Sequence, residues 1–424
     1  MMSEYQRWEL PNRLRVITVP MEGISSATVL VLVGAGSRYE SKNKAGLSHF
    51  LEHMIFKGTQ KRPTAFEISS LVDSVGAENN AYTSKDQTGF YIKVDQKHLE
   101  LAFDVLSDTL LNSLFKTEEI DRERGTIIEE INMYEDTPRF KIDDVFYELL
   151  YDQTPLGWSV AGYKETVANI KRKDFLDYTQ RFYHGQNMVL AVAGRVNSQD
   201  VQTLAEKYFG AFSRGERLLP QKIVLAQNQP RVKLFQKKTD QAHLYLGFPA
   251  FSFSDPDRYV LNVLHAILGG GMSSRLFIEV RERRGLAYYV HTNVDLFEDT
   301  GVFNVAAGLN LNKIDEAVKI VLAELEKIKA GEIKESELAR AKEFLQGRMT
   351  LSLESSRAMA DWYAERELLQ GKIETPPEFF KQVEKVTLQD LQRVAKRVFA
   401  LKKRNLAIIG PYENQEKFLK LLEE

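Results

Sequence analysis

Cysteine is absent from the 424-residue sequence, and its absence narrows the chemistry that the chain offers. Without thiols the protein forms no disulfide bonds and has no thiolate to bind a metal ion. Any zinc site must therefore consist of histidine and carboxylate side chains.

Strong net charge and long apolar runs are absent as well. The net charge of −2 gives no electrostatic reason to expect a nucleic-acid or membrane-surface partner. The longest apolar runs, near residues 27–36 and 188–194, are too short to cross a bilayer and predict buried strands. The polar segment 1–10 lacks the apolar core of a signal peptide. These features predict a cytoplasmic protein.

The length of the chain predicts two domains of about 200 residues each. A shift of 216 residues places Leu190–Gly194 on Leu406–Gly410 and His49 on His265, which indicates an internal repeat. The polar segment between the halves contains Pro220 and Pro230 and is typical of a linker. We therefore predict a domain over 1–214, a linker over 215–230 and a homologous domain over 231–424.

The first half is predicted to contain two strands, two helices, a further strand region and then helices, and we predict an α+β fold. We expect each domain to be a mostly antiparallel sheet with helices packed on one side. Thr64 is the expected cap of one helix, and Gly76 is its expected stop. In the first half the predicted strands are 14–19, 27–33 and 188–192, the region 79–94 is predicted as a strand pair, and the predicted helices are 65–75, 96–111, 117–134, 174–183 and 200–210.

The segment His49-Phe50-Leu51-Glu52-His53 is the most informative part of the sequence. His49 and His53 are one helical turn apart, and Glu52 shares their face, so the three side chains converge on one point. This is the inverted form of the zincin helix motif. Two imidazoles bind zinc, and a neighbouring carboxylate takes a proton from water, so the motif predicts a metal-dependent hydrolase of the peptidase type.

A chance match is the alternative, because any helix can carry two histidines and a glutamate at this spacing. The rest of the segment is apolar, however, with Leu47, Phe50, Leu51, Met54 and Ile55 around the polar trio. Burying the trio without a shared partner would be costly, which favours a metal site.

A catalytic zinc with two histidines needs a third protein ligand. The acidic helix predicted over 117–134 contains Glu123, Glu129 and Glu130. Glu123 and Glu130 are seven positions apart and share a face with Ile127. We predict Glu130 as the third ligand and Glu123 as the carboxylate that hydrogen-bonds a ligand histidine. From the helical pattern alone Glu129 competes with Glu130, and an ordinary solvated acidic face is a further alternative.

These motifs together resemble the pitrilysin/insulysin family of inverzincin zinc metallopeptidases, in particular its processing-peptidase branch, which is mitochondrial processing peptidase-like. The resemblance covers the whole chain. It implies Glu130 rather than Glu129 as the metal ligand and one Zn²⁺ per chain. It also implies that Asn80, Ala81, Tyr82 and Thr83 form the strand that binds the peptide substrate.

The second half resembles the family in the segments Gly269–Phe277 and Val280–Tyr289. A glycine-rich loop alone would suggest phosphate binding, but no Lys-Ser/Thr follows it as a nucleotide-binding loop requires. The resemblance implies a substrate-clamping element here, in which Arg281 and Tyr288 assist catalysis.

The resemblance also implies an assembly. Single-chain members of the family enclose a chamber with four such domains, and this chain has two. We therefore expect a homodimer in which Arg281 and Tyr288 act on the partner's zinc site. The expected activity is zinc-dependent endopeptidase hydrolysis of peptides or unfolded polypeptide segments. Two alternatives stay open, namely a non-catalytic structural subunit of the core-protein type and a catalytic subunit that needs a separate inactive partner chain.

Overall fold

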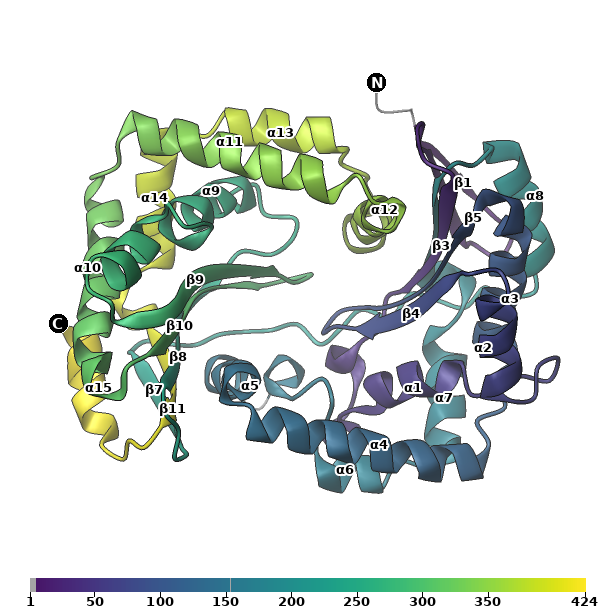
Figure 1. Ribbon diagram of the computed structural model, residues 1–424, viewed down its shortest axis with the longest axis horizontal. Coiled ribbons are helices and arrows are strands. Elements are labelled where there is room, and N and C mark those ends of the chain that lie inside the picture. The colour runs from purple at the N-terminus through teal and green to yellow at the C-terminus, as the bar shows by residue number, and fades with distance from the viewer. Residues whose placement is uncertain (1–4, 153) are drawn as a thin grey trace. The chain divides into compact units, whose positions relative to one another are not determined.

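The computed structural model describes residues 5–152 and 154–424 of the chain (Figure 1). Residues 1–4, on which part of the signal-peptide expectation rests, lie outside the described residues. The chain forms two compact units, each containing its own β-sheet. Unit 1 comprises Met1–Ile131, Trp158–Gln221 and Leu351–Glu374, and unit 2 comprises Asn132–Gly157, Lys222–Thr350 and Thr375–Glu424.

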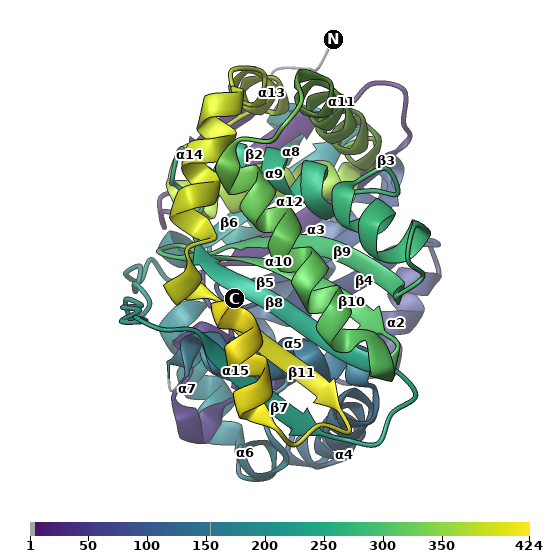
Figure 2. The same ribbon diagram turned by 90° about the vertical axis from the view of Figure 1, so that its left-hand side faces the viewer.

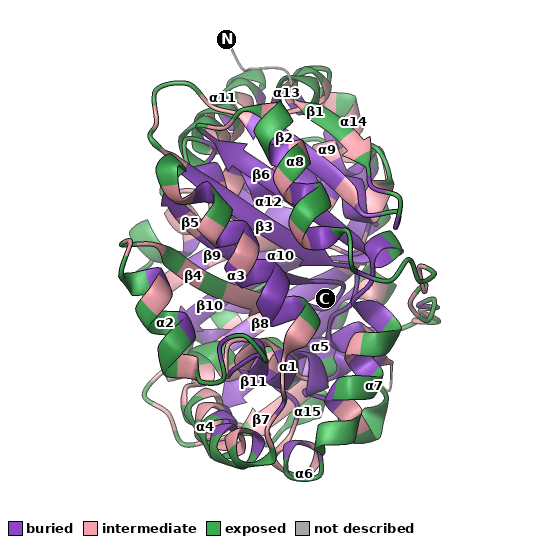
Figure 3. Cartoon of the chain, turned by 90° about the vertical axis from the view of Figure 1, so that its right-hand side faces the viewer, coloured by how far each residue is buried: buried purple, intermediate pink, exposed green. Residues whose placement is uncertain are grey.

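Unit 1 is organised around a six-stranded sheet in the order β1-β2-β6-β3-β5-β4. Only the β2–β6 pair is parallel, and the other neighbours are antiparallel. The central strands β3 and β6 consist mostly of apolar residues and are almost entirely buried, as Figure 3 shows. The strands are β1 (Gln6–Glu9), β2 (Arg15–Pro20), β3 (Ser26–Val33), β4 (Glu78–Thr83), β5 (Thr88–Asp95) and β6 (Met188–Gly194).

Helices cover both faces of this sheet. Helix α12 lies on β3 and β6 on one face, whereas α3 and α8 lie on the other (Figure 1). The helices of this part of the chain are α1 (Leu47–Ile55), α2 (Ala65–Asp73), α3 (Leu99–Asn112), α4 (Thr117–Asp136), α6 (Lys164–Ala168), α7 (Arg172–Phe182), α8 (Ser198–Phe209) and α12 (Ser356–Gln370), with short turns η1 (Ser37–Tyr39), η2 (Lys42–Lys44), η3 (Gln96–His98) and η5 (Gly185–Asn187).

Unit 2 contains a five-stranded sheet in the order β7-β11-β8-β10-β9, in which only the β7–β11 pair is parallel. Helices α10, α14 and α15 cover one face (Figure 2). The strands are β7 (Arg231–Gln236), β8 (Ala242–Ala250), β9 (Ala287–Leu296), β10 (Gly301–Leu309) and β11 (Asn405–Gly410). The helices are α5 (Pro138–Tyr151), α9 (Arg258–Gly269), α10 (Ile314–Ala330), α11 (Glu335–Ser352), α13 (Pro376–Glu384), α14 (Leu388–Val398) and α15 (Gln415–Glu423), with η4 (Pro155–Gly157), η6 (Phe277–Glu282), η7 (Leu311–Lys313) and η8 (Leu401–Lys403).

The two halves of the chain repeat the same order of elements from β2 and β7 onwards, so the predicted α+β fold with two homologous halves is confirmed. The prediction that helices pack on one side only is wrong for the sheet of unit 1, because α12 covers the face opposite α3 and α8. A shift of 216 residues carries β2 onto β7 and α7 onto α14 with identical bounds. The same shift carries α4 near α11 and α1 near α9. Positions in α1 and α4 therefore correspond to positions in α9 and α11.

The compact units are not continuous in sequence, and they differ from the predicted division into 1–214 and 231–424 at two segments. Helix α5 packs on the second sheet, and α12 packs on the first. In unit 2, Ile142 and Phe146 of α5 are fully buried beside Ala407 and Ile409 of β11. Each such apolar side chain stabilises this packing by about 1.5–3 kcal/mol. The sheet on which each of these two helices is buried determines the unit to which it belongs. The position of the helix in the sequence does not reveal that sheet.

Segment 215–230 contains no helix or strand, and the boundary between the units at Gln221 lies inside it. Its role as a linker between homologous domains stays a prediction. None of the helices in the described residues is both long enough and apolar enough to span a membrane.

Candidate functional site

Helix α1 brings His49, Glu52 and His53 to one face, as the motif predicts. The helix begins after Gly46, whose φ of 94° and close approach to the Ala161 carbonyl exclude a side chain. The buried carboxylate of Glu40 accepts hydrogen bonds from the backbone N–H groups of Gly46 (2.8 Å) and Ser48 (2.6 Å). Burial raises the pKa of Glu40 to about 7. This cap on the helix that carries the motif was not predicted.

Helix α4 supplies the two predicted carboxylates. Glu130 Oε2 lies 3.6 Å from His49 Nε2 and 3.6 Å from His53 Nε2. Glu123 Oε1 lies 2.9 Å from His53 Nδ1, and Glu123 Oε2 lies 2.5 Å from Lys57 Nζ. Both carboxylates therefore face α1. Glu130 lies near the Nε2 atoms of both rings, and Glu123 contacts the Nδ1 atom of His53. Glu129, the alternative ligand, is exposed.

The atoms of His49, His53 and Glu130 fit a zinc ion. Separations of 3.6 Å are too long for direct hydrogen bonds between the rings and the carboxylate. Tetrahedral zinc with bonds of about 2.0–2.1 Å holds its ligand atoms about 3.3 Å apart, close to the observed separation. In the described part of the chain this is the only group of histidine and acidic side chains with such mutual spacing. Two neutral imidazoles and one carboxylate are a donor set that zinc accepts.

The surroundings of the two rings shift the pKa values of His49 and His53 in opposite directions. For His49, burial and the neighbouring His53 lower the pKa to about 4. For His53, burial lowers the pKa, but the hydrogen bond to Glu123 and the nearby carboxylate charges outweigh burial and raise it. Burial raises the pKa of Glu123, and its contacts with His53 and Lys57 outweigh that effect and lower it. Glu123 thus stays ionised and orients one ring, a role in which a carboxylate is common beside metal-bound histidines.

Glu52 lies beside this cluster and is held by a residue of β4. Thr83 Oγ1 donates a hydrogen bond to Glu52 Oε2 at 2.6 Å. Burial raises the pKa of Glu52, and the Thr83 hydrogen bond acts in the opposite direction. The sequence predicted Thr83 as part of the substrate strand and missed this contact.

The predicted substrate strand, Asn80 to Thr83, belongs to β4, the last strand of its sheet. Among the described residues β4 pairs only with β5, so its other edge has no strand beside it. An edge of this kind accepts an added strand through backbone hydrogen bonds. Ala81 and Tyr82 pair with Phe90 and Gly89 on β5, which fixes the register of the strand.

The two predicted residues of the second half lie in unit 2. Arg281 is in η6, and Tyr288 is near the start of β9. Both side chains are exposed, Tyr288 by 70%. The guanidinium of Arg281 lies 5.8 Å from the centre of the Tyr288 ring. The two side chains are therefore neighbours on the surface of this unit.

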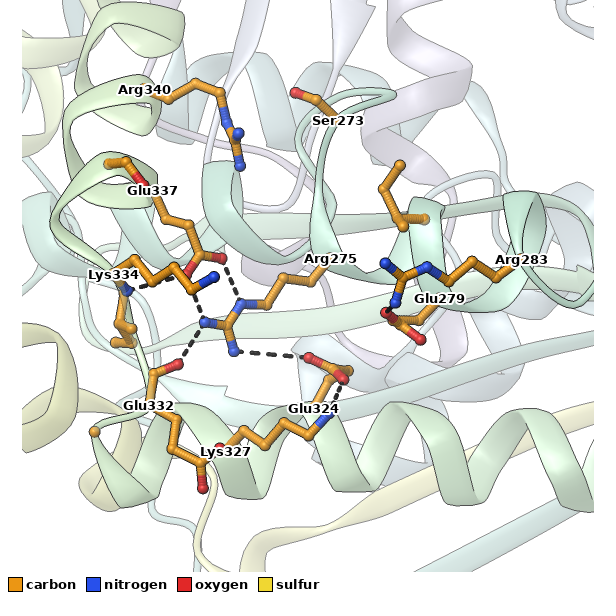
Figure 4. A pocket seen from close by; sticks show the side chains of 14 residues that line it. Ser273, Arg275, Glu279, Arg283, Glu324, Lys327, Glu332, Lys334, Glu337 and Arg340 are labelled. Atoms are coloured by element: carbon orange, nitrogen blue, oxygen red, sulfur yellow. Dashed lines mark hydrogen bonds and ion pairs between the residues drawn. The ribbon is translucent and has the colours of Figure 1, made fainter.

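Arg275, in the predicted clamping segment, has a structural role. It donates two hydrogen bonds to Glu337, at 2.7 and 2.8 Å, and lies 3.6 Å from Glu324. These contacts tie the glycine-rich loop to α10 and α11 beside a cavity of about 790 Å³ (Figure 4). Four acidic side chains line this cavity beside five basic ones, so it has no strong charge of one sign: Arg275, Glu279, Arg283, Glu324, Lys327, Glu332, Lys334, Glu337 and Arg340.

Unit 2 has a histidine, His265, at the position that corresponds to His49, but it lacks the rest of the motif. His265 on α9 accepts or donates one hydrogen bond, with Thr292 Oγ1 at 2.8 Å. Burial lowers the pKa of His265 to about 4. The positions that correspond to Glu52 and His53 are Leu268 and Gly269, so α9 has no second ligand and no carboxylate.

Known proteins resemble the chain over nearly its whole length. The family profile described as Insulinase (Peptidase family M16) matches residues 15–164, and the profile described as Peptidase M16 inactive domain matches residues 169–345. An uncharacterized zinc protease of Streptomyces coelicolor is 36% identical over 419 residues, which cover 97% of this chain and 90% of the relative. The uncharacterized zinc protease YmxG of Bacillus subtilis is 34% identical over 411 residues, which cover 96% of this chain and 99% of the relative.

Solved structures with a similar fold are known as well. The crystal structure of a protease from Helicobacter pylori superposes with a TM-score of 0.92 at 28% identity, covering 97% of this chain and 100% of that one. A chain of Complex III2 from Candida albicans has a TM-score of 0.86 at 17% identity, covering 98% of this chain and 99% of that one, and this likeness shows the fold alone. On the strength of the sequence relatives and the shared fold, the chain belongs to peptidase family M16, the insulinase family.

Proposed function

We propose that the protein is a zinc-dependent endopeptidase that hydrolyses peptides or unfolded polypeptide segments. The observation that carries the proposal is the convergence of His49, His53 and Glu130 beside Glu52. The whole-chain similarity to zinc proteases supports it. His49, His53 and Glu130 are the proposed ligands of one zinc ion per chain, and Glu123 is the proposed carboxylate that orients His53.

Each remaining side chain has a separate task in this mechanism. When bound, zinc supplies a Lewis acid that polarises the scissile carbonyl and lowers the pKa of water. Glu52 takes a proton from the attacking water and returns it to the leaving amine. Its burial and its place on the same helical face as both ligands support this role. The burial that raises the pKa of Glu52 also makes its protonated form a usable acid in the second half of the reaction.

The proposed substrate contact is the free edge of β4. A peptide that pairs with the backbone of Asn80, Ala81, Tyr82 and Thr83 would be bound with little demand on its side chains. Such binding suits unfolded segments, because a folded protein rarely offers an extended strand with free backbone groups.

Arg281 and Tyr288 are the proposed donors to the peptide carbonyl or to the developing oxyanion. Loss of one such donor costs about 3 kcal/mol of transition-state stabilisation. Their exposure on unit 2 leaves them accessible to a second chain. We propose a homodimer that encloses a chamber, in which these residues act on the partner's zinc site. Mixed dimers of a Glu52→Gln chain and an Arg281→Ala chain should then regain part of the activity, whereas exchanging dimers with no rescue would contradict action in trans.

A non-catalytic structural subunit is the second candidate function, because the likeness to a chain of Complex III2 extends over the whole fold. The intact set of His49, Glu52, His53 and Glu130 favours the enzyme. The third candidate is a catalytic subunit that needs an inactive partner chain. The presence of both Arg281 and Tyr288 in this chain favours self-assembly over that alternative.

Cleavage of a quenched peptide by the purified chain tests all three proposals. The endopeptidase should lose activity with a chelator and regain it with zinc. A structural subunit would cleave nothing at any zinc concentration, and a catalytic half would cleave only after a second chain is added. A cytoplasmic location stays a prediction that cell fractionation tests.

A further inference from the structure

The last two residues of β4 are held on opposite faces of the sheet of unit 1. Successive side chains of a strand point to opposite faces, so Tyr82 and Thr83 lie on different sides. Tyr82 donates a hydrogen bond through its hydroxyl to Asp361 of α12, at 2.6 Å. Thr83 donates to Glu52 of α1, also at 2.6 Å. A single strand thus connects the helix on one face with the motif helix on the other.

The contacts of Tyr82 fix the position of β4. Its ring lies over Gly89 on β5, where an added Cβ would come within 2.3 Å of the ring. The ring of Tyr82 also lies 5.6 Å from the guanidinium of Arg357, which forms an ion pair with Asp361 at 3.4 Å. The packing of the Tyr82 ring on Gly89 and the partly buried hydrogen bond to Asp361 restrict the movement of this end of the strand.

The contact of Thr83 constrains the carboxylate of Glu52. In the described part of the chain, the hydrogen bond from Thr83 is the only one that this carboxylate accepts, and it engages Oε2. Oε1 is therefore the oxygen left for a water molecule. Threonine suits this task because its branched Cβ restricts the rotation that would move the hydroxyl away.

We propose that Thr83 is a positioning residue of the reaction, whose hydroxyl holds Glu52 in the orientation for proton transfer from the same strand that pairs with the peptide. This inference rests on the proposed function and adds a residue to it. If one strand both binds the peptide and orients Glu52, it fixes the position of the scissile bond relative to the Glu52 carboxylate. Misplacement of a reacting group by about 1 Å costs on the order of 100-fold in rate.

Three substitutions at residue 83 separate the hydroxyl from the shape of the side chain. Thr83→Val keeps the shape and removes the hydroxyl, Thr83→Ser keeps the hydroxyl, and Thr83→Ala removes both. We expect kcat to fall between about 10-fold and 100-fold in Thr83→Val and Thr83→Ala, with KM within about twofold. Thr83→Ser should stay within about threefold of the wild-type kcat. Zinc content and the melting temperature identify variants that have lost the ion or the fold.

A double-mutant cycle tests whether Thr83 acts through Glu52. In a Glu52→Gln background, Thr83→Val should cause little further loss, because the base that it orients is already gone. An unchanged kcat in Thr83→Val, an equal loss in Thr83→Ser, a change in KM alone, or additive losses in the cycle would each overturn the proposal.

Crystals of the metal-free protein give a readout that does not depend on activity. Glu52 should occupy one rotamer in the wild type and more than one in Thr83→Val. A single unchanged rotamer in the variant would count against the proposal. If the wild type cleaves no peptide with zinc present, the proposed function fails, and the rotamer of Glu52 still decides whether Thr83 orients this side chain.

Discussion

The two units share one arrangement of elements, and among the described residues only unit 1 has a set of three side chains that could hold a metal ion. His49 and His265 occupy corresponding positions on α1 and α9, and burial lowers the pKa of each to about 4. Beside His49 lie His53, Glu52 and the carboxylates of α4, whereas the α9 positions are Leu268 and Gly269. The fold therefore provides a partly buried histidine twice, and the neighbouring residues decide whether a metal ion could bind there.

The first prediction replaces the corresponding histidine of each unit. His49→Ala should lose the zinc and with it several kcal/mol of transition-state stabilisation, which is about 1,000-fold or more in kcat/KM. His265→Gln is the matched control and should keep both zinc and activity, because in the described residues His265 belongs to no group of three or more histidine and acidic side chains with metal-binding spacing. Metal analysis and peptide cleavage check the pair, and equal loss of zinc in both variants would break the comparison.

The second prediction separates Glu130 from its exposed neighbour Glu129 on α4. Glu130→Gln should weaken zinc binding by more than about 100-fold, because an amide replaces a charged ligand. Glu129→Gln removes the same charge one position away and should change zinc affinity little. Competition with a zinc chelator gives both constants. Similar affinities for the two variants would remove Glu130 from the proposed ligand set.

The third prediction concerns Glu123, which has no acidic counterpart in unit 2, where the shift of 216 residues leads to Ala339. Glu123→Gln should weaken zinc binding by about 10-fold to 100-fold. It should also lower the pKa of His53, because a charge that raises this pKa is removed. Exposed Glu118 on the same helix serves as the control through Glu118→Gln. NMR titration of His53 in metal-free protein measures the shift, and an unchanged pKa would contradict the prediction.

The fourth prediction concerns stability as the pH falls. A histidine with a folded-state pKa below its unfolded value binds more protons when unfolded, so the folded state loses stability as the pH falls below about 6.5. For His265, with a pKa of about 4, the loss at pH 4.5 is about 2 kcal/mol. In metal-free protein His265→Gln should reduce the acid destabilisation by this amount, as denaturant unfolding at pH 7 and 4.5 would show. Equal acid sensitivity of variant and wild type would contradict the burial of a neutral ring.

Local features of the sequence predicted much of the fold and of the site. The spacing of His49, Glu52 and His53 predicts a shared helical face, and Glu123 and Glu130 share a face over two turns of another helix. The pattern left Glu129 as an alternative to Glu130, and the family resemblance selected Glu130. Thr64 caps α2 through a capping box with Glu67, as a threonine followed three positions later by glutamate predicts.

The remaining features depend on contacts between distant parts of the chain. Tyr82 and Asp361 are 279 positions apart, and no periodic pattern joins them. The hydrogen bond from Thr83 to Glu52 requires the order of the sheet to be known, because it depends on β4 lying beside α1. Helix α5 shows a weak apolar side in its sequence, but α12 shows almost none, because it buries the charged residues Arg366 and Glu367 beside Met359 and Leu368. Neither sequence identifies the sheet on which the helix packs.

Zinc titration of the metal-free protein tests the central claim most directly. We expect peptide cleavage to rise with added zinc and to reach a plateau at one zinc ion per chain, and we expect no such rise in His49→Ala. A plateau at two ions per chain, or zinc bound at one equivalent with no cleavage of any peptide, would contradict a single catalytic zinc site in unit 1.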